Sequence, residues 1–333
     1  MTVPKDARPF PKKAVDAAKA IKARRAPALR AYPHVCGLGV GFKVKGGKRL
    51  PTLALRVYVT DKVPLGRLKP ADRLPRTVDG LPVDVIVRRP RIRMFDPYHP
   101  APTHSIPYGV LLGGITVGVE GIGTGTLGGS MFENGSLLDV ILTNWHVACL
   151  EIDCRSGNVL QPSEFDGRGR ERRVGTVLRS VLDERVDCAI LGLNGVAFLE
   201  RTVLDVGQMG VVVPAELGMA IQKSGRTSGL TLGTIIDVDG DVDVSNASGE
   251  GSVFHHTGQI EFEGDDGMVQ RGDSGSLMLD MNGNVVGLVY AATEDGDSGH
   301  ACHIQDVFNA LDINLTAGMS QQDLIAATTG VFE

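Results

Sequence analysis

The stretch Gln270–Ser276, QRGDSGS, decides how this sequence is interpreted. Ser274 stands between Asp273 and Gly275, just before an apolar run. A serine hydroxyl alone is a weak nucleophile, and it needs a base, a group that orients the base, and donors for an oxyanion. The same letters are also typical of a plain turn. The interpretation therefore depends on whether the rest of the chain supplies those partners.

Two earlier segments carry a histidine and an aspartate beside apolar runs. LTNWHV places His146 at the end of one run, and VDCAIL places Asp187 at the start of another. Each residue alone is typical of ordinary packing or of a turn. Together with Ser274 they stand in the order His, Asp, Ser, which is one of the known chain orders of a serine triad. Asp183 and Asp153 are weaker candidates for the acid, because neither directly precedes an apolar strand.

These three motifs make the sequence resemble the trypsin-like, chymotrypsin-fold serine peptidases, in the bacterial form with an LTNxHV histidine motif. The resemblance covers roughly residues 108–312 and rests on the triad logic. It implies that His146, Asp187 and Ser274 are catalytic, and that the amides of Gly272 and Ser274 form an oxyanion hole. It implies a serine endopeptidase that hydrolyses peptide bonds through an acyl-enzyme, without a metal or another cofactor.

The resemblance also implies a primary substrate pocket. Met268 takes the position at its base where a trypsin-like enzyme has an aspartate, so we expect an apolar or small side chain rather than Lys or Arg. Arg271 and His303 form a basic pair that would favour an acidic side chain, unless both are solvated surface residues. Activation by cleavage, which would bring an amine to Asp273, stays open. The residues expected to bind substrate are Met268, Arg271, Tyr290, Ala291 and Ala292.

The distribution of apolar residues predicts a mainly β chain with a small α/β unit in front. Short apolar runs broken by Gly, Asn and Asp recur after Tyr108, which is typical of a barrel or sandwich. We expect a double six-stranded β-barrel of the chymotrypsin-like kind at residues 108–333, ending with a helix at 304–312. A basic α/β domain at 1–95 would precede it, with a helix at 12–26 and strands at 36–44, 53–60 and 82–87. Residues 96–107 form a Pro-rich linker.

Charge is divided unevenly along the 333 residues. The net charge is −5, but residues 1–95 carry 23 of the 34 Lys and Arg and only 6 of the 39 Asp and Glu. This split predicts that the basic N-terminal domain docks on the acidic peptidase domain, or that it has an anionic partner. Nucleic acid is the weaker alternative, because aromatic residues are few there and no nucleic-acid motif is present.

The remaining signals concern location and rival functions. No apolar run reaches the roughly 20 residues that span a bilayer, and the N-terminus lacks an apolar signal core, so we expect a cytoplasmic protein. Five cysteines favour free thiols, although Cys149 and Cys154 are close enough to pair. The expected partner is a protein or peptide substrate. The alternatives are a non-catalytic binding module on a peptidase fold, or an esterase with the same triad.

Overall fold

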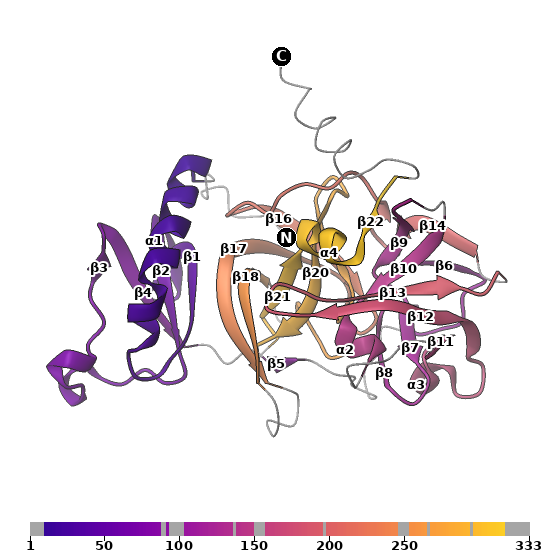
Figure 1. Cartoon of the computed structure of the whole chain (residues 1–333), viewed down its shortest axis with the longest axis horizontal. Helices are drawn as coiled ribbons and strands as arrows, with labels where there is room; N and C mark the ends of the chain where they lie inside the picture. Colours follow the sequence, from indigo (N-terminus) through magenta and orange to yellow (C-terminus); the bar gives the residue numbers. More distant parts are fainter. Residues whose placement is uncertain are drawn as a thin grey trace, which may run out of the picture.

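The computed structural model (Figure 1) describes residues 10–87, 91–92, 103–135, 138–149, 157–195, 198–245, 253–264, 267–293 and 296–316. Its first part is an α/β unit in which a long helix packs on a short sheet, and this confirms the helix and strands expected there. The proline-containing helix continues four residues beyond the expected end. The elements are α1 (Lys12–Arg30), β1 (Val35–Lys45), β2 (Lys48–Val59), η1 (Leu65–Arg67), η2 (Pro70–Asp72), β3 (Thr77–Val78) and β4 (Leu81–Val87).

The last part of the chain forms a closed barrel of six strands. The strands follow the order β16-β19-β20-β21-β18-β17, and pairing of β16 with β17 closes the barrel. This is the six-stranded barrel that the sequence predicts. Its strands are β16 (Ala220–Gly225), β17 (Gly229–Ser245), β18 (Val253–Gly264), β19 (Leu277–Asp280), β20 (Val285–Ala292) and β21 (Ser298–His303). Helix α4 (Ile304–Leu311) follows β21, where the sequence predicts the last helix.

The middle of the chain folds into a second curled sheet, which has eight strands in the order β22-β9-β10-β13-β12-β11-β7-β8. It has more than the expected six strands, and one of its edge strands is β22, which follows helix α4 and pairs with β9. Its members are β7 (Thr116–Val119), β8 (Gly123–Thr126), β9 (Gly129–Glu133), β10 (Asp139–Thr143), β11 (Asn158–Gln161), β12 (Arg172–Leu182), β13 (Asp187–Leu193) and β22 (Ile313–Asn314). A three-stranded sheet of β6 (Val110–Gly113), β14 (Phe198–Val203) and β15 (Gly207–Gln208) adjoins it.

The N-terminal unit shares a sheet with the closed barrel, because β1 pairs antiparallel with β17 (Figure 1). Four buried polar side chains, here called the junction cluster, bridge the two: Arg56, Tyr58, Asp237 and Glu261. The Arg56 guanidinium lies 2.8 Å from the Glu261 carboxylate, and the Tyr58 hydroxyl donates to Asp237 at 2.8 Å and also to Glu261. The boundaries 1–95, 96–107 and 108–333 stay a prediction, since most of the expected linker lies outside the described residues. Within the described part, no helix is long and apolar enough to cross a membrane.

Candidate active site

His146 and Asp187 meet because their strands are neighbours. β10 pairs with β13 with Thr143 opposite Ala189, so the short helix α2 (Trp145–Ala148) starts beside the first residue of β13. The Asp187 Oδ2 atom lies 2.5 Å from His146 Nδ1, and Oδ1 accepts the His146 backbone amide at 3.2 Å. Asn144 fixes the geometry further, since its side-chain amide donates to the Asp187 carbonyl at 2.7 Å. The imidazole is thus held at one nitrogen by a buried carboxylate.

The charge on Asp187 is stabilised by its surroundings. Complete burial acts to raise the pKa of the carboxyl, but the charge of His146 and its hydrogen bond outweigh this, with help from His256. The net result is a lowered pKa, so the carboxylate is ionised at neutral pH. The Cys302 thiol also faces Asp187, 3.4 Å from its backbone amide. An ionised carboxylate at Nδ1 keeps the Nδ1–H tautomer and leaves Nε2 as the nitrogen that can act as a base.

Ser274 lies where the two β regions touch. Its carbonyl accepts the Thr126 amide of β8 at 2.8 Å, and its hydroxyl donates to the Tyr290 carbonyl of β20 at 3.4 Å. A Cβ atom added to Gly125 would lie 2.8 Å from that Ser274 carbonyl and 2.5 Å from a methyl of Val147, the residue after His146. The histidine helix and the Ser274 loop therefore converge on Gly125. His146 Nε2 is buried, and no hydrogen bond reaches it from the described residues.

The backbone around Ser274 requires two glycines. Gly272 and Gly275 have φ of +98° and +96°, which side-chain-bearing residues rarely adopt. A Cβ atom at Gly272 would also lie 2.5 Å from Thr227 Oγ1, and one at Gly275 would lie 2.2 Å from the Thr126 carbonyl. Thr126 Oγ1 donates to the Gly272 carbonyl at 2.7 Å, which turns that carbonyl toward the protein. The loop is therefore fixed in one conformation.

Asp273 has an internal cation as its partner, which the sequence alone did not reveal. Lys223 Nζ lies 3.0 Å from Asp273 Oδ2, and both side chains are fully buried. Ser228 Oγ donates to the same carboxylate at 2.6 Å, as do the backbone amides of Gln270, Thr227 and Ser228 at 2.9–3.0 Å. Burial acts to raise the pKa of Asp273, but Lys223 and these donors lower it overall. The Asp273 carboxylate therefore already has a cationic partner, and it does not need the amine that cleavage of the chain would free.

The five residues expected to bind substrate have different surroundings. Met268 is buried in the barrel core, where its side chain faces Gly233 and Gly264 of β17 and β18. Tyr290, Ala291 and Ala292 lie in β20 and are also buried, whereas Arg271 is partly exposed. Thr227 Oγ1 donates to the Arg271 carbonyl, so that residue belongs to the loop of Ser274. Their roles in substrate binding stay a prediction.

Other candidates from the sequence have structural partners. Asp183 accepts the amides of Arg185 and Val186 at 2.7 and 2.9 Å, so it is a turn residue. Asp153 lies outside the described residues. His303 Nε2 contacts the Val238 carbonyl at 3.2 Å, and burial lowers the pKa of this histidine to about 4, so it is not a cation of the pocket rim at neutral pH.

His255 and His256 both lie in strand β18. His256 is fully buried, its ring centroid is 4.9 Å from that of Tyr290, and it interacts electrostatically with Asp187. Neither ring nitrogen has a partner among the described residues. The alternating pattern VFHHTGQIEFEG is the signal that predicts this strand.

The cysteines differ in state. Cys149, at the end of α2, is disulfide-bonded, so the expectation of free thiols is wrong for this residue. Cys154, its candidate partner, lies outside the described residues. Cys188 and Cys302 are buried thiols, and burial raises the pKa of both well above the usual range. They are therefore protonated at neutral pH and are poor nucleophiles.

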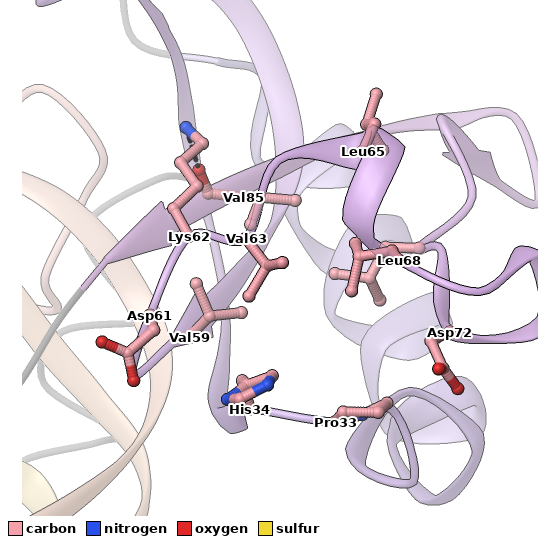
Figure 2. Close-up of a pocket in the computed structure, with 11 residues that line it drawn as sticks. Pro33, His34, Val59, Asp61, Lys62, Val63, Leu65, Leu68, Asp72 and Val85 are labelled. Atoms are coloured by element: carbon pink, nitrogen blue, oxygen red, sulfur yellow. Dashed lines mark hydrogen bonds between the residues drawn. The ribbon is translucent and has the colours of Figure 1, made fainter.

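A cavity of about 240 Å³ opens in the N-terminal unit (Figure 2). Its apolar lining includes Val59, Leu65 and Val85. His34, Asp61 and Lys62 stand at one side of it in Figure 2. None of its lining residues belongs to the site around Ser274, so the cavity takes no part in the chemistry discussed below.

Comparisons with known proteins bear on the fold. No protein-family model and no curated protein matches the chain. Among solved structures, it is similar to Protease A of Thermobifida fusca, with 18% identity over 63% of this chain and all of that one, at a TM-score of 0.47. A Cellulomonas bogoriensis chymotrypsin matches with 18% identity, covering 62% of this chain and 98% of that chain, at a TM-score of 0.46. A glutamic acid-specific serine protease matches with 17% identity, covering 62% of this chain and all of that one, at a TM-score of 0.48.

The chain has a chymotrypsin-like fold. Its own curled sheets, with Ser274 between them, carry that conclusion. The three similar structures are proteases of this fold.

Proposed function

We propose that this protein is a serine endopeptidase in which His146, Asp187 and Ser274 form the catalytic triad. The observation that carries the proposal is the 2.5 Å contact between His146 Nδ1 and the buried Asp187 carboxylate. It leaves Nε2 as the only basic nitrogen, in the helix that converges with the Ser274 loop on Gly125. Among the described residues Nε2 has no hydrogen-bond partner, so it is available as a base.

The reaction follows from these roles. Ser274 Oγ attacks the carbonyl carbon of a peptide bond while His146 Nε2 takes its proton, and Asp187 stabilises the imidazolium. The amides of Gly272 and Ser274 receive the oxyanion, because the positive φ of Gly272 allows its N–H to turn toward the reacting carbonyl. His146 then gives its proton to the leaving amine, and an acyl-enzyme on Ser274 remains. Water activated by the same histidine hydrolyses it.

The Lys223–Asp273 pair supports activity without cleavage of the chain. In this account Lys223 supplies the positive charge that a newly freed amine would otherwise bring to Asp273. The loop that carries Gly272 and Ser274 is then already in its working conformation after folding. Regulation must act elsewhere, on access to the site.

We propose further that the N-terminal unit docks permanently on the barrel through the junction cluster. Lys22 adds a buried ion pair, 2.6 Å from Asp241. The side chains of Arg56 and Glu261 are 1% and 0% exposed. Salt screens such buried pairs far less than surface pairs. We therefore expect high salt to leave hydrogen exchange of β1 unchanged, contrary to simple attraction between two charged surfaces. Loss of the hydrogen-exchange protection of β1 in 1 M NaCl would instead show that the N-terminal unit is held by exposed ion pairs.

Reaction with a small fluorophosphonate tests the enzymatic proposal. Such a probe labels a serine only when base and oxyanion donors are assembled around it. The parent protein should be labelled, while Ser274→Ala and His146→Gln should not be, with unchanged circular dichroism for both variants. A folded parent that does not react would favour a binding module on this fold.

A further inference from the structure

Next to Ser274, one edge of β20 is no longer covered by its neighbour β19. On this side β19 pairs with β20 up to Leu277 opposite Leu288, and Val289 then bonds the backbone of Gly275 and Ser276. Beyond this point β19 no longer covers β20. The next carbonyl, that of Tyr290, accepts the Ser274 hydroxyl at 3.4 Å. The edge from Tyr290 to Ala292 therefore begins at the nucleophile and leads away from it.

The chain itself occupies this edge. Strand β5 (Arg91–Ile92), from the segment between the N-terminal unit and the eight-stranded sheet, pairs antiparallel with β20 (Figure 1). Ile92 lies opposite Ala291 and Arg91 lies opposite Ala292. On its other side Arg91 lies opposite Ser245 at the end of β17, in parallel pairing. The backbone of β5 is thus held between two strands.

The direction in which β5 runs along β20 indicates how this contact relates to Ser274. Because the pairing is antiparallel and moves from Ala292 to Ala291 as the chain advances, β5 runs toward Tyr290 and hence toward Ser274. An extended peptide that reached Ser274 along β20 would use the same backbone groups as β5. Main-chain pairing of this kind binds peptides with little regard to sequence. β5 therefore has the position and the direction of a bound peptide.

We propose that β5 occupies the edge Tyr290–Ala292 in cis, as a strand that competes with an extended peptide substrate for the same backbone groups. This inference rests on the proposed function, because it assigns regulation to the site around Ser274. A tethered strand acts at an effective concentration of the order of millimolar. It thus lowers the apparent affinity of every peptide that needs this edge, while small electrophiles that need only Ser274 and the oxyanion donors still react.

The test compares two probes on the full chain. One is a small fluorophosphonate, and the other is a tetrapeptide that carries a phosphonate ester in place of the scissile bond. Arg91→Pro/Ile92→Pro removes the backbone donors of β5, and Arg91→Ala/Ile92→Ala is its matched control, which keeps them. We expect the fluorophosphonate to react alike with the parent and both variants. The peptide probe should react about tenfold faster with the proline variant than with the other two.

Equal peptide-probe rates in the parent and the proline variant, with normal fluorophosphonate labelling, would overturn the inference and leave the proposed function intact. Absence of fluorophosphonate labelling in every form would instead overturn the proposed function. A second measurement does not depend on the variant. In the parent, reaction with the peptide probe should release the amides of Arg91 and Ile92 to hydrogen exchange, and unchanged protection would also refute competition by β5.

Discussion

Lys223→Met is the substitution whose effect follows most closely from the structure. It keeps the length of the side chain in a fully buried site but removes the cation 3.0 Å from Asp273 Oδ2. Breaking a buried ion pair by removing one partner costs about 3–5 kcal/mol, because the remaining charge is left uncompensated. Asp273 retains Ser228 Oγ and three backbone amides as donors. The cost should therefore be at the lower end, about 3 kcal/mol.

The cost falls on the conformation of the Ser274 loop. The uncompensated charge of Asp273 is costly only while the carboxylate is buried. The loop can lower this cost by turning Asp273 to solvent, and this movement also displaces Gly272 and Ser274. A shift of about 3 kcal/mol changes the ratio of the working to the displaced conformation on the order of 100-fold. We expect the rate of fluorophosphonate labelling to fall, with that factor as its upper bound. The circular dichroism of the folded variant should stay that of the parent.

Two further variants make this prediction specific. Lys22→Met breaks another buried ion pair, with Asp241, and should leave the labelling rate unchanged although it lowers stability. Lys223→Met/Asp273→Asn removes the stranded charge and should recover part of the rate, since the amide oxygen can still accept two of the four hydrogen bonds. A single Lys223→Met variant that is labelled at the parental rate would refute the role given to the pair.

Three other predictions follow from the same geometry. Gly272→Ala should lower the labelling rate 10²–10³-fold, because its Cβ would meet Thr227 Oγ1 and displace one oxyanion donor; a rate within threefold of the parent would contradict this. Asp187→Asn should lower the labelling rate about 10⁴-fold at neutral pH, since His146 loses the tautomer that leaves Nε2 as the base. Labelling time courses of the purified variant would measure this decrease. Burial and the charge of Glu261 raise the pKa of Asp237 to about 6 against the pull of Arg56. The folded state thus binds a proton more tightly than the unfolded one, and the stability gained from this group below pH 4 is lost as the pH rises through 6. Urea unfolding should show that loss in the parent and a flatter dependence in Asp237→Asn.

The sequence predicted the site candidates and the secondary structure where a short motif lies directly beside a single strand or helix. The triad candidates lie in short apolar contexts, so their order along the chain suggested a site before any geometry was known. The helix at Lys12–Arg30 and the strand at Leu81–Val87 also follow directly from periodicity and turn residues. Local patterns of this kind need no knowledge of distant partners.

The contacts that the sequence did not reveal all join distant parts of the chain. Lys223 and Asp273 are 50 residues apart, and nothing beside either residue indicates the other. A lysine in a buried strand is a weak signal, because lysine is usually solvated. The pairing of β5 with β20 joins Ile92 to Ala291, whereas the sequence predicts for Ile92 only a place near the end of the domain at 1–95. Charge asymmetry suggested docking of the N-terminal unit, but it gave no register between β1 and β17.

A crystal structure of the fluorophosphonate adduct tests the central claim most directly, because it shows the attacked atom and the oxyanion donors together. We expect phosphorus on Ser274 Oγ, with its oxygen about 2.7–3.1 Å from the amide nitrogens of Gly272 and Ser274. His146 should keep its contact with Asp187 and turn Nε2 toward the adduct. An adduct on another residue, or a phosphoryl oxygen turned away from both amides, would contradict the assignment of this site as a serine peptidase centre.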